Sequence, residues 1–122
     1  MEEIVYKKNQ VIFTQGTYER CMYDIRFGTV GIYVNYGTKE QRELTRLGQD
    51  AFFGEMGMIE AYPRSATAVA LEKGTICQRI DVDSFGEYFK TRPAKVMSIM
   101  QHMSRRIREL SAEVEQLRRE KQ

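Results

Sequence analysis

Phe53–Ile59 reads FGEMGMI and Pro63–Ala70 reads PRSATAVA, and three residues separate the two stretches. Together they place a carboxylate, Glu55, and a guanidinium, Arg64, on either side of a segment rich in backbone N–H donors. A short helix that begins near Gly54 would present unpaired N–H groups and a partial positive charge, which favour an anion. The pattern predicts a site for a small ligand that carries both a hydroxyl and an anionic group.

The side chains in these stretches suit a sugar phosphate that keeps its 2′-hydroxyl group. Arg64 offers a planar fork of donors that matches phosphate oxygens, and Ser65 adds a hydroxyl and its own N–H. Glu55 can accept a hydrogen bond from a vicinal hydroxyl, which a deoxyribose would lack. Gly54 and Gly57 let the backbone approach a ligand closely. On these residues alone, a weak surface ion pair between Glu55 and Arg64 stays an alternative.

Length and composition limit the class of protein. With 122 residues, of which 42% are hydrophobic and 30% charged, the chain is predicted to be one domain. A net charge of +2 is too small to indicate nucleic-acid binding by itself. Cys21 and Cys77 are isolated, which favours free thiols in a reducing compartment. No signal peptide and no apolar run of membrane-spanning length is recognised, so we expect a soluble cytoplasmic protein.

Residues from about 4 to 80 have the composition of strands and turns. Short apolar or alternating runs are separated by glycines, and each has strand length; they cover residues 11–13, 21–27, 30–34, 43–47, 67–71 and 75–80. Glycines at turns supply positive φ without steric cost. This pattern of short runs separated by glycines predicts an antiparallel sandwich, barrel or roll.

The character of the sequence changes after Ile80. Asp81 or Asp83 can cap a short helix, and Pro93 marks the start of the next one. From Ala94 to the end there is no Gly or Pro, and apolar residues recur every three or four positions, at Val96, Ile99, Met103, Ile107, Leu110, Val114 and Leu117. This predicts one long amphipathic helix with later heptad spacing. A helix docked on its own roll is one interpretation, and a parallel two-helix coiled coil that forms a homodimer is the favoured one.

The two opening stretches resemble the phosphate-binding cassette of cyclic nucleotide-binding domains. That family carries Phe-Gly-Glu, a short helix, and then Pro-Arg-(Ala/Ser/Thr)-Ala-(Thr/Ser), and residues 53–55 and 63–67 match this pattern. Residues 7–16, 22–34, 81–85 and 104–108 extend the resemblance over almost the whole chain. It is most similar to the ligand-sensing domain of bacterial cyclic-AMP receptor-type regulators. Gly57 departs from many members, which have Ala there.

The resemblance implies a mainly β fold with flanking helices. An antiparallel, jelly-roll-like β-roll (about 4–80, with the cassette at 53–70) would precede a short helix and a long C-terminal amphipathic helix (about 82–122), in a single domain of residues 1–122. It also implies a non-catalytic cyclic nucleotide sensor that signals through movement of the C-terminal helix and a dimer interface. cAMP is the favoured ligand, and cGMP stays open because Ser65 does not decide between them.

In this interpretation Arg64 binds the cyclic phosphate and Glu55 the ribose 2′-hydroxyl. The long helix contacts the base around residues 108–113, where Ser111 is the polar candidate and Leu110 packs on the ring; an exposed helix-surface role for Ser111 stays open. The full set of predicted ligand-binding residues is Phe53, Gly54, Glu55, Met56, Gly57, Arg64, Ser65, Ala66, Thr67, Leu110 and Ser111.

Other classes of function receive little support. A metal-dependent jelly roll needs several His and carboxylate ligands, and the chain has one histidine, His102, so we expect no enzyme, no catalytic residues, no metal and no cofactor. Arginines in the long helix are interleaved with glutamates, which favours a solvated coiled-coil surface over direct nucleic-acid binding. The remaining rival is a nucleotide-independent dimerisation or docking module of the same fold.

Overall fold

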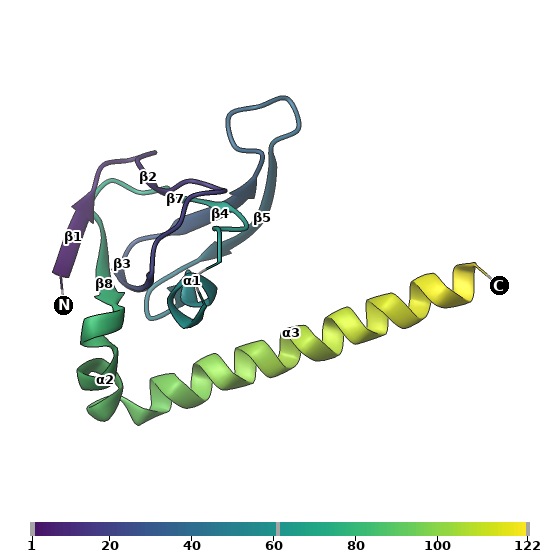
Figure 1. The fold of residues 1–122 in the computed structure, drawn as a ribbon. Helices are drawn as coiled ribbons and strands as arrows, with labels where there is room; N and C mark the ends of the chain where they lie inside the picture. The colour runs from purple at the N-terminus through teal and green to yellow at the C-terminus, as the bar shows by residue number, and fades with distance from the viewer. Residues whose placement is uncertain (1, 61, 122) are drawn as a thin grey trace. The chain divides into compact units, whose positions relative to one another are not determined.

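The computed structural model describes residues 2–60 and 62–121. The chain divides into two compact units, one up to Gly86 and one from Glu87. The first unit contains the strands and one short helix (Figure 1). Its elements are β1 (Glu2–Tyr6), β2 (Val11–Phe13), β3 (Cys21–Phe27), β4 (Val30–Val34), β5 (Arg42–Leu47), β6 (Phe52–Phe53), α1 (Glu55–Ile59), β7 (Thr67–Ala70) and β8 (Thr75–Asp81). The prediction of a single domain over residues 1–122 stays a prediction.

The strands form two antiparallel sheets, in the orders β1-β8-β3-β6 and β2-β7-β4-β5. This confirms the predicted mainly β, antiparallel architecture. The centre of the first sheet is the β3–β8 pair, in which Met22 opposes Ile80 and Ile25 opposes Cys77. All four side chains are fully buried. Strands β1 and β6 were not among the predicted runs. Among the described residues, β1 is an edge strand paired with β8, and β6 is two residues long.

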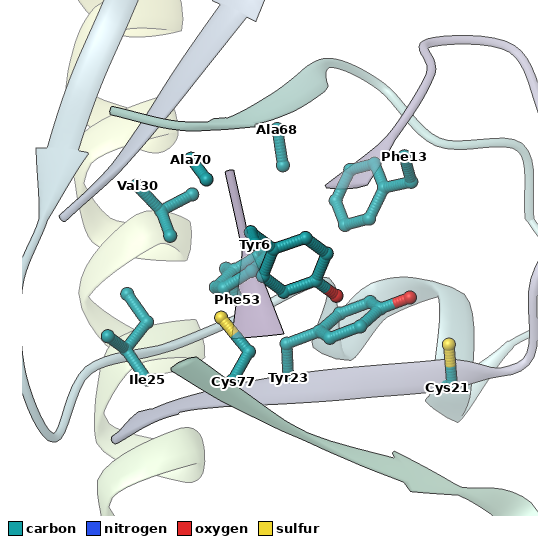
Figure 2. Close-up of a cluster of buried hydrophobic side chains, with 10 residues drawn as sticks. All are labelled: Tyr6, Phe13, Cys21, Tyr23, Ile25, Val30, Phe53, Ala68, Ala70 and Cys77. Atoms are coloured by element: carbon teal, nitrogen blue, oxygen red, sulfur yellow. The ribbon is translucent and has the colours of Figure 1, made fainter. Parts of the chain in front are cut away.

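Four aromatic residues, Tyr6, Phe13, Tyr23 and Phe53, belong to the buried cluster of the roll (Figure 2). The ring centroid of Phe13 lies 5.8 Å from the ring centroid of Tyr23 and 5.8 Å from that of Phe53. The rings of Tyr23 and Phe53 are stacked, with their centroids 5.1 Å apart. Burying an aromatic side chain contributes about 1.5–3 kcal/mol. Because Phe53 immediately precedes Gly54 and α1, this packing fixes where the helix begins.

The two cysteines are free and buried, in agreement with the sequence interpretation. Burial raises the pKa of the Cys77 thiol to about 12, so this thiol stays protonated at neutral pH.

Helix α2 (Val82–Lys90) spans the boundary between the two units. The backbone N–H of Ser84 donates to Oδ1 of Asp81 at 2.9 Å, which identifies Asp81 as the capping residue. In the second unit, Oγ1 of Thr91 donates to the carbonyl oxygen of Tyr88 at 3.3 Å after the end of α2.

Helix α3 (Pro93–Glu120) follows with Pro93 at its first position. It is one continuous helix, as predicted, and its later apolar residues are exposed: Ile107 by 64%, Leu110 by 52%, Val114 by 50% and Leu117 by 54%. Within the described residues, no helix combines the length and apolar character that crossing a membrane requires.

Candidate ligand-binding site

Helix α1 is introduced by a left-handed turn at Gly54, where φ is 77° and ψ is 12°. Glycine adopts this conformation without steric cost, whereas other residues are strained there. The turn lies between β6, which pairs with β3, and the first residue of α1, Glu55. The backbone therefore changes direction at the point where the cassette begins.

Arg64 is buried, with 5% of its surface exposed, although arginine is among the residues least often buried. Its Nη1 donates to the carbonyl oxygen of Gly54 at 2.6 Å and its Nη2 to the carbonyl oxygen of Cys21 at 2.8 Å. Nη2 also lies 3.4 Å from Sγ of Cys21. The guanidinium carbon lies 4.2 Å from the centroid of the Phe13 ring. Carbonyl dipoles, a thiol and an aromatic face thus surround the charge.

The backbone of Arg64 is also anchored. Its N–H donates to the carbonyl oxygen of Thr17, and its own carbonyl accepts from the N–H of Gly16, both at 2.8 Å. These two bonds hold the β2–β3 connection beside the cassette. The position of the side chain is therefore set from both ends, by the backbone bonds and by the partners of the guanidinium.

Both cassette glycines make room for the arginine side chain. A β-carbon on Gly54 would lie 2.8 Å from Nη1 of Arg64, and one on Gly57 would lie 2.5 Å from it. From the sequence, these glycines were expected to let the backbone approach a ligand closely. The structure adds a second reason, since the guanidinium occupies the space that a larger residue would fill.

The Nε atom of Arg64 is buried and has no hydrogen-bond partner among the described residues. Leaving a buried donor unsatisfied costs about 1–3 kcal/mol, and more for a charged group. A charged guanidinium with a free buried N–H is suited to an anionic acceptor, which would remove that cost.

Glu55 occupies the first position of α1 and is 6% exposed. A carboxylate in the first turn is favoured by the helix dipole. Because Glu55 and Arg64 are both buried, the alternative of an exposed surface ion pair does not fit the structure.

The other predicted site residues have diverse environments. Phe53 is 4% exposed and packs in the aromatic cluster, whereas Met56 is 48% exposed. Ser65 is exposed and Ala66 is buried. Thr67 is buried, and its Oγ1 accepts the backbone N–H of Gln15 at 2.9 Å. The nine predicted cassette residues therefore all lie in the first unit, and they differ widely in burial.

Leu110 and Ser111 lie on α3, in the second unit, and both are exposed. Their predicted contact with the base stays a prediction. An open hollow of about 570 Å³ lies on α3 before them, lined by Met97, Met100, Gln101, Ser104, Arg105 and Arg108. No cassette residue lines this hollow. The candidate site is therefore assigned from the chemistry of the buried arginine and not from the size of the hollow.

Sequence reasoning missed two members of the site, Phe13 and Cys21. Phe13 had been assigned to a strand, and nothing in the sequence indicates a contact with a residue 51 positions later. Cys21 contributes a backbone carbonyl, which any residue could supply, so no residue type marks it. Among the described residues, no three His, Cys, Asp or Glu side chains gather where they could hold a metal ion.

The fold and the buried arginine define a small ligand-binding domain of the β-roll class. The family model of the cyclic nucleotide-binding domain matches residues 3–92. The chain therefore belongs to the cyclic nucleotide-binding domain family.

Individual relatives agree with this assignment. The cyclic AMP receptor protein of Thermus thermophilus is 27% identical over 113 residues, which are 93% of this chain and 52% of that protein. A cAMP-dependent protein kinase regulatory subunit of Debaryomyces hansenii is 33% identical over 81 residues, covering 66% of this chain and 17% of that protein. The crystal structure of the Thermus thermophilus catabolite activator protein has a TM-score of 0.81 at 27% identity, covering 95% of this chain and 54% of that one. The chain thus spans about half the length of the Thermus protein.

Proposed function

We propose that this chain is a non-catalytic sensor of a cyclic nucleotide, with cAMP as the ligand. The observation that carries the proposal is the buried Arg64, whose Nε has no partner among the described residues. A cyclic phosphate supplies the anionic acceptor that this group lacks. Membership of the cyclic nucleotide-binding domain family supports the same class of ligand.

Each polar group of the ligand has a proposed partner. Arg64 binds the cyclic phosphate, helped by Ser65 and by the backbone between Gly54 and Gly57. Glu55 accepts a hydrogen bond from the ribose 2′-hydroxyl. Leu110 and Ser111 contact the base. No step of this scheme breaks a covalent bond, so the proposed role is binding and regulation.

The choice of cAMP over cGMP rests on the relatives. The Thermus protein is named a cyclic AMP receptor and the Debaryomyces protein a cAMP-dependent regulatory subunit. A cGMP-dependent protein kinase of Plasmodium berghei is also 30% identical, over 78 residues. Titration with both nucleotides is therefore part of the test.

The proposed output is a change in α3 and in a homodimer that α3 forms. Ile107, Leu110, Val114 and Leu117 follow heptad spacing and are at least half exposed, and a second copy of α3 would cover them. Ligand binding shifts this equilibrium only if the ligand has different affinities for the two arrangements. The same exposed residues favour the rival role, a dimerisation module that needs no nucleotide.

Calorimetric titration with cAMP and cGMP tests the proposal on the wild type and on Arg64→Ala. We expect micromolar or tighter binding of cAMP by the wild type. The variant leaves the phosphate unpaired and should bind about 30- to 5,000-fold more weakly.

Arg46→Ala is the matched control, because Arg46 is an exposed arginine that pairs with Glu43 on β5. It should bind like the wild type. Circular dichroism must show that each variant is folded. If folded wild type binds neither nucleotide, the sensor proposal is wrong and the dimerisation module becomes the leading account.

A further inference from the structure

Contacts within the protein hold the guanidinium of Arg64 on three sides. Gly54 and Cys21 accept from its two Nη atoms, and the ring of Phe13 covers one face at 4.2 Å. The two carbonyls fix the direction of the Nη atoms within the guanidinium plane. The ring sets how far the guanidinium lies from the aromatic face. Together they leave Nε as the donor without a partner among the described residues.

Phe13 is itself fixed. It ends β2, its backbone pairs with Ala68 of β7, and it is 7% exposed. Its ring packs against Tyr23 and Phe53 in the cluster that Figure 2 shows. A ring with these neighbours cannot move without disturbing the packed core. Phe13 therefore supplies a rigid surface for the arginine.

This arrangement matters for binding because a free arginine side chain has many rotamers. Ordering such a side chain when a ligand arrives weakens the observed affinity. A cation over an aromatic face is attracted by the ring quadrupole, most strongly where water is excluded, as it is here. The ring of Phe13 can thus order the guanidinium in advance.

We propose that Phe13, which lies outside the cassette, is a positioning residue that holds the Arg64 guanidinium in the orientation in which it binds the anion. The inference rests on the proposed function, because it assumes that Arg64 binds the cyclic phosphate. It adds a requirement for an aromatic face at position 13. An aliphatic residue of similar size would fill the core there but would not attract the cation.

The sharpest test replaces Phe13 with mono-, di- and trifluorinated phenylalanine and titrates each protein with cAMP. Fluorine weakens the negative face of the ring while it changes the size of the ring little. We expect affinity to fall progressively with each fluorine, reaching about 3- to 30-fold for the trifluorinated ring. The ratio of the affinities for cAMP and 2′-deoxy-cAMP should stay constant, because that ratio depends on Glu55.

A second measurement follows the arginine without ligand. In protein labelled with ¹⁵N-arginine, restricted rotation should give separate NMR signals for the Nη–H groups of Arg64. Phe13→Leu should merge these signals. Tyr6→Leu is the matched control, because Tyr6 belongs to the same buried cluster but its ring forms no cation–π contact among the described residues. It should lower the melting temperature and leave the Arg64 signals separate.

The possible outcomes separate the inference from the function on which it rests. A progressive loss of affinity at constant ribose preference supports the inference. Equal affinity across the fluorinated series overturns it and leaves the proposed function intact. If Tyr6→Leu merges the Arg64 signals as Phe13→Leu does, general loosening of the core explains the effect and the inference is wrong. If the wild type binds no cyclic nucleotide, the proposed function fails and the inference fails with it.

Discussion

Gly57 and Arg64 lie so close together that a β-carbon at position 57 would be 2.5 Å from Nη1 of the arginine. The same β-carbon would be 2.9 Å from the carbonyl oxygen of Glu19, which is backbone and cannot easily move away. Gly57→Ala should therefore destabilise the fold by about 1–3 kcal/mol, the usual range for overpacking. By displacing the guanidinium it should also weaken cAMP binding by about tenfold, the equivalent of one lost hydrogen bond.

Urea unfolding and calorimetric titration measure these two effects. Gly86→Ala is the control, because a β-carbon there meets nothing within 4 Å and Gly86 lies in α2. That change should stabilise the protein by about 0.4–1 kcal/mol. Wild-type affinity in a Gly57→Ala protein would show that the position of the guanidinium is unimportant.

Glu55→Gln should reduce the preference for ribose over 2′-deoxyribose. The buried carboxylate is proposed to accept a hydrogen bond from the 2′-hydroxyl, and a bond to a charged group contributes about 1.5–3 kcal/mol. The variant should bind cAMP about 10- to 100-fold more weakly, with a smaller change for 2′-deoxy-cAMP. Titration of both proteins with both ligands gives the comparison. An unchanged ratio of the two affinities would remove Glu55 from the ribose site.

The cap at the start of α2 predicts a dependence of stability on pH. Hydrogen bonds from Ser84 lower the pKa of the Asp81 carboxyl below its ordinary value of 3.8. Because the folded pKa is the lower one, the stabilisation is present above about pH 3.8 and is lost as pH falls through the folded pKa. Asp81→Ala should therefore lower the melting temperature clearly at pH 7 and by less near pH 3.

Asp83→Ala is the matched control for this pH series, since it removes a carboxylate from the first turn of the same helix and leaves Asp81 in place. Its effect on the melting temperature should be smaller at pH 7. An Asp81→Ala effect of equal size at both pH values would contradict the assignment of the cap.

Val114→Asp and Leu117→Asp should each produce monomers if α3 forms a coiled-coil dimer. Both residues are at least half exposed in the single chain, and a charge in a dimer seam would be buried without a partner. Light scattering should give twice the mass of one chain for the wild type and for Ala112→Asp, and the mass of one chain for the two seam variants. A monomeric wild type would rule out the proposed dimer.

The helix and the strand of the cassette could be predicted from the sequence because residue types carried the information. Phe53–Ile59 and Pro63–Ala70 indicated a short helix with glycines and then a strand from Thr67, with Arg64 between them, and the structure has α1 and β7 at these places. The long helix was equally clear, because its apolar periodicity runs for many turns without Gly or Pro. Such local patterns need no knowledge of the fold.

The surroundings of Arg64 could not be predicted in this way. Its burial contradicts the usual preference of arginine for the surface, and its partners are two backbone carbonyls and a ring from a distant strand. Thr67 shows the same limit: its place among the ligand-binding residues stays a prediction, and the sequence did not indicate that Oγ1 accepts a hydrogen bond from the backbone N–H of Gln15. Tertiary contacts of this kind leave no periodic trace in the sequence.

The burial of Cys21 and Cys77 makes the protein convenient for site-specific spectroscopy. Both native thiols are 0% exposed, so a maleimide or nitroxide reagent should leave them unmodified in the folded protein. A single cysteine introduced at exposed Ala112 would then carry the label alone. In a dimer, the separation of two such labels would report directly how far apart the helices move when nucleotide is added.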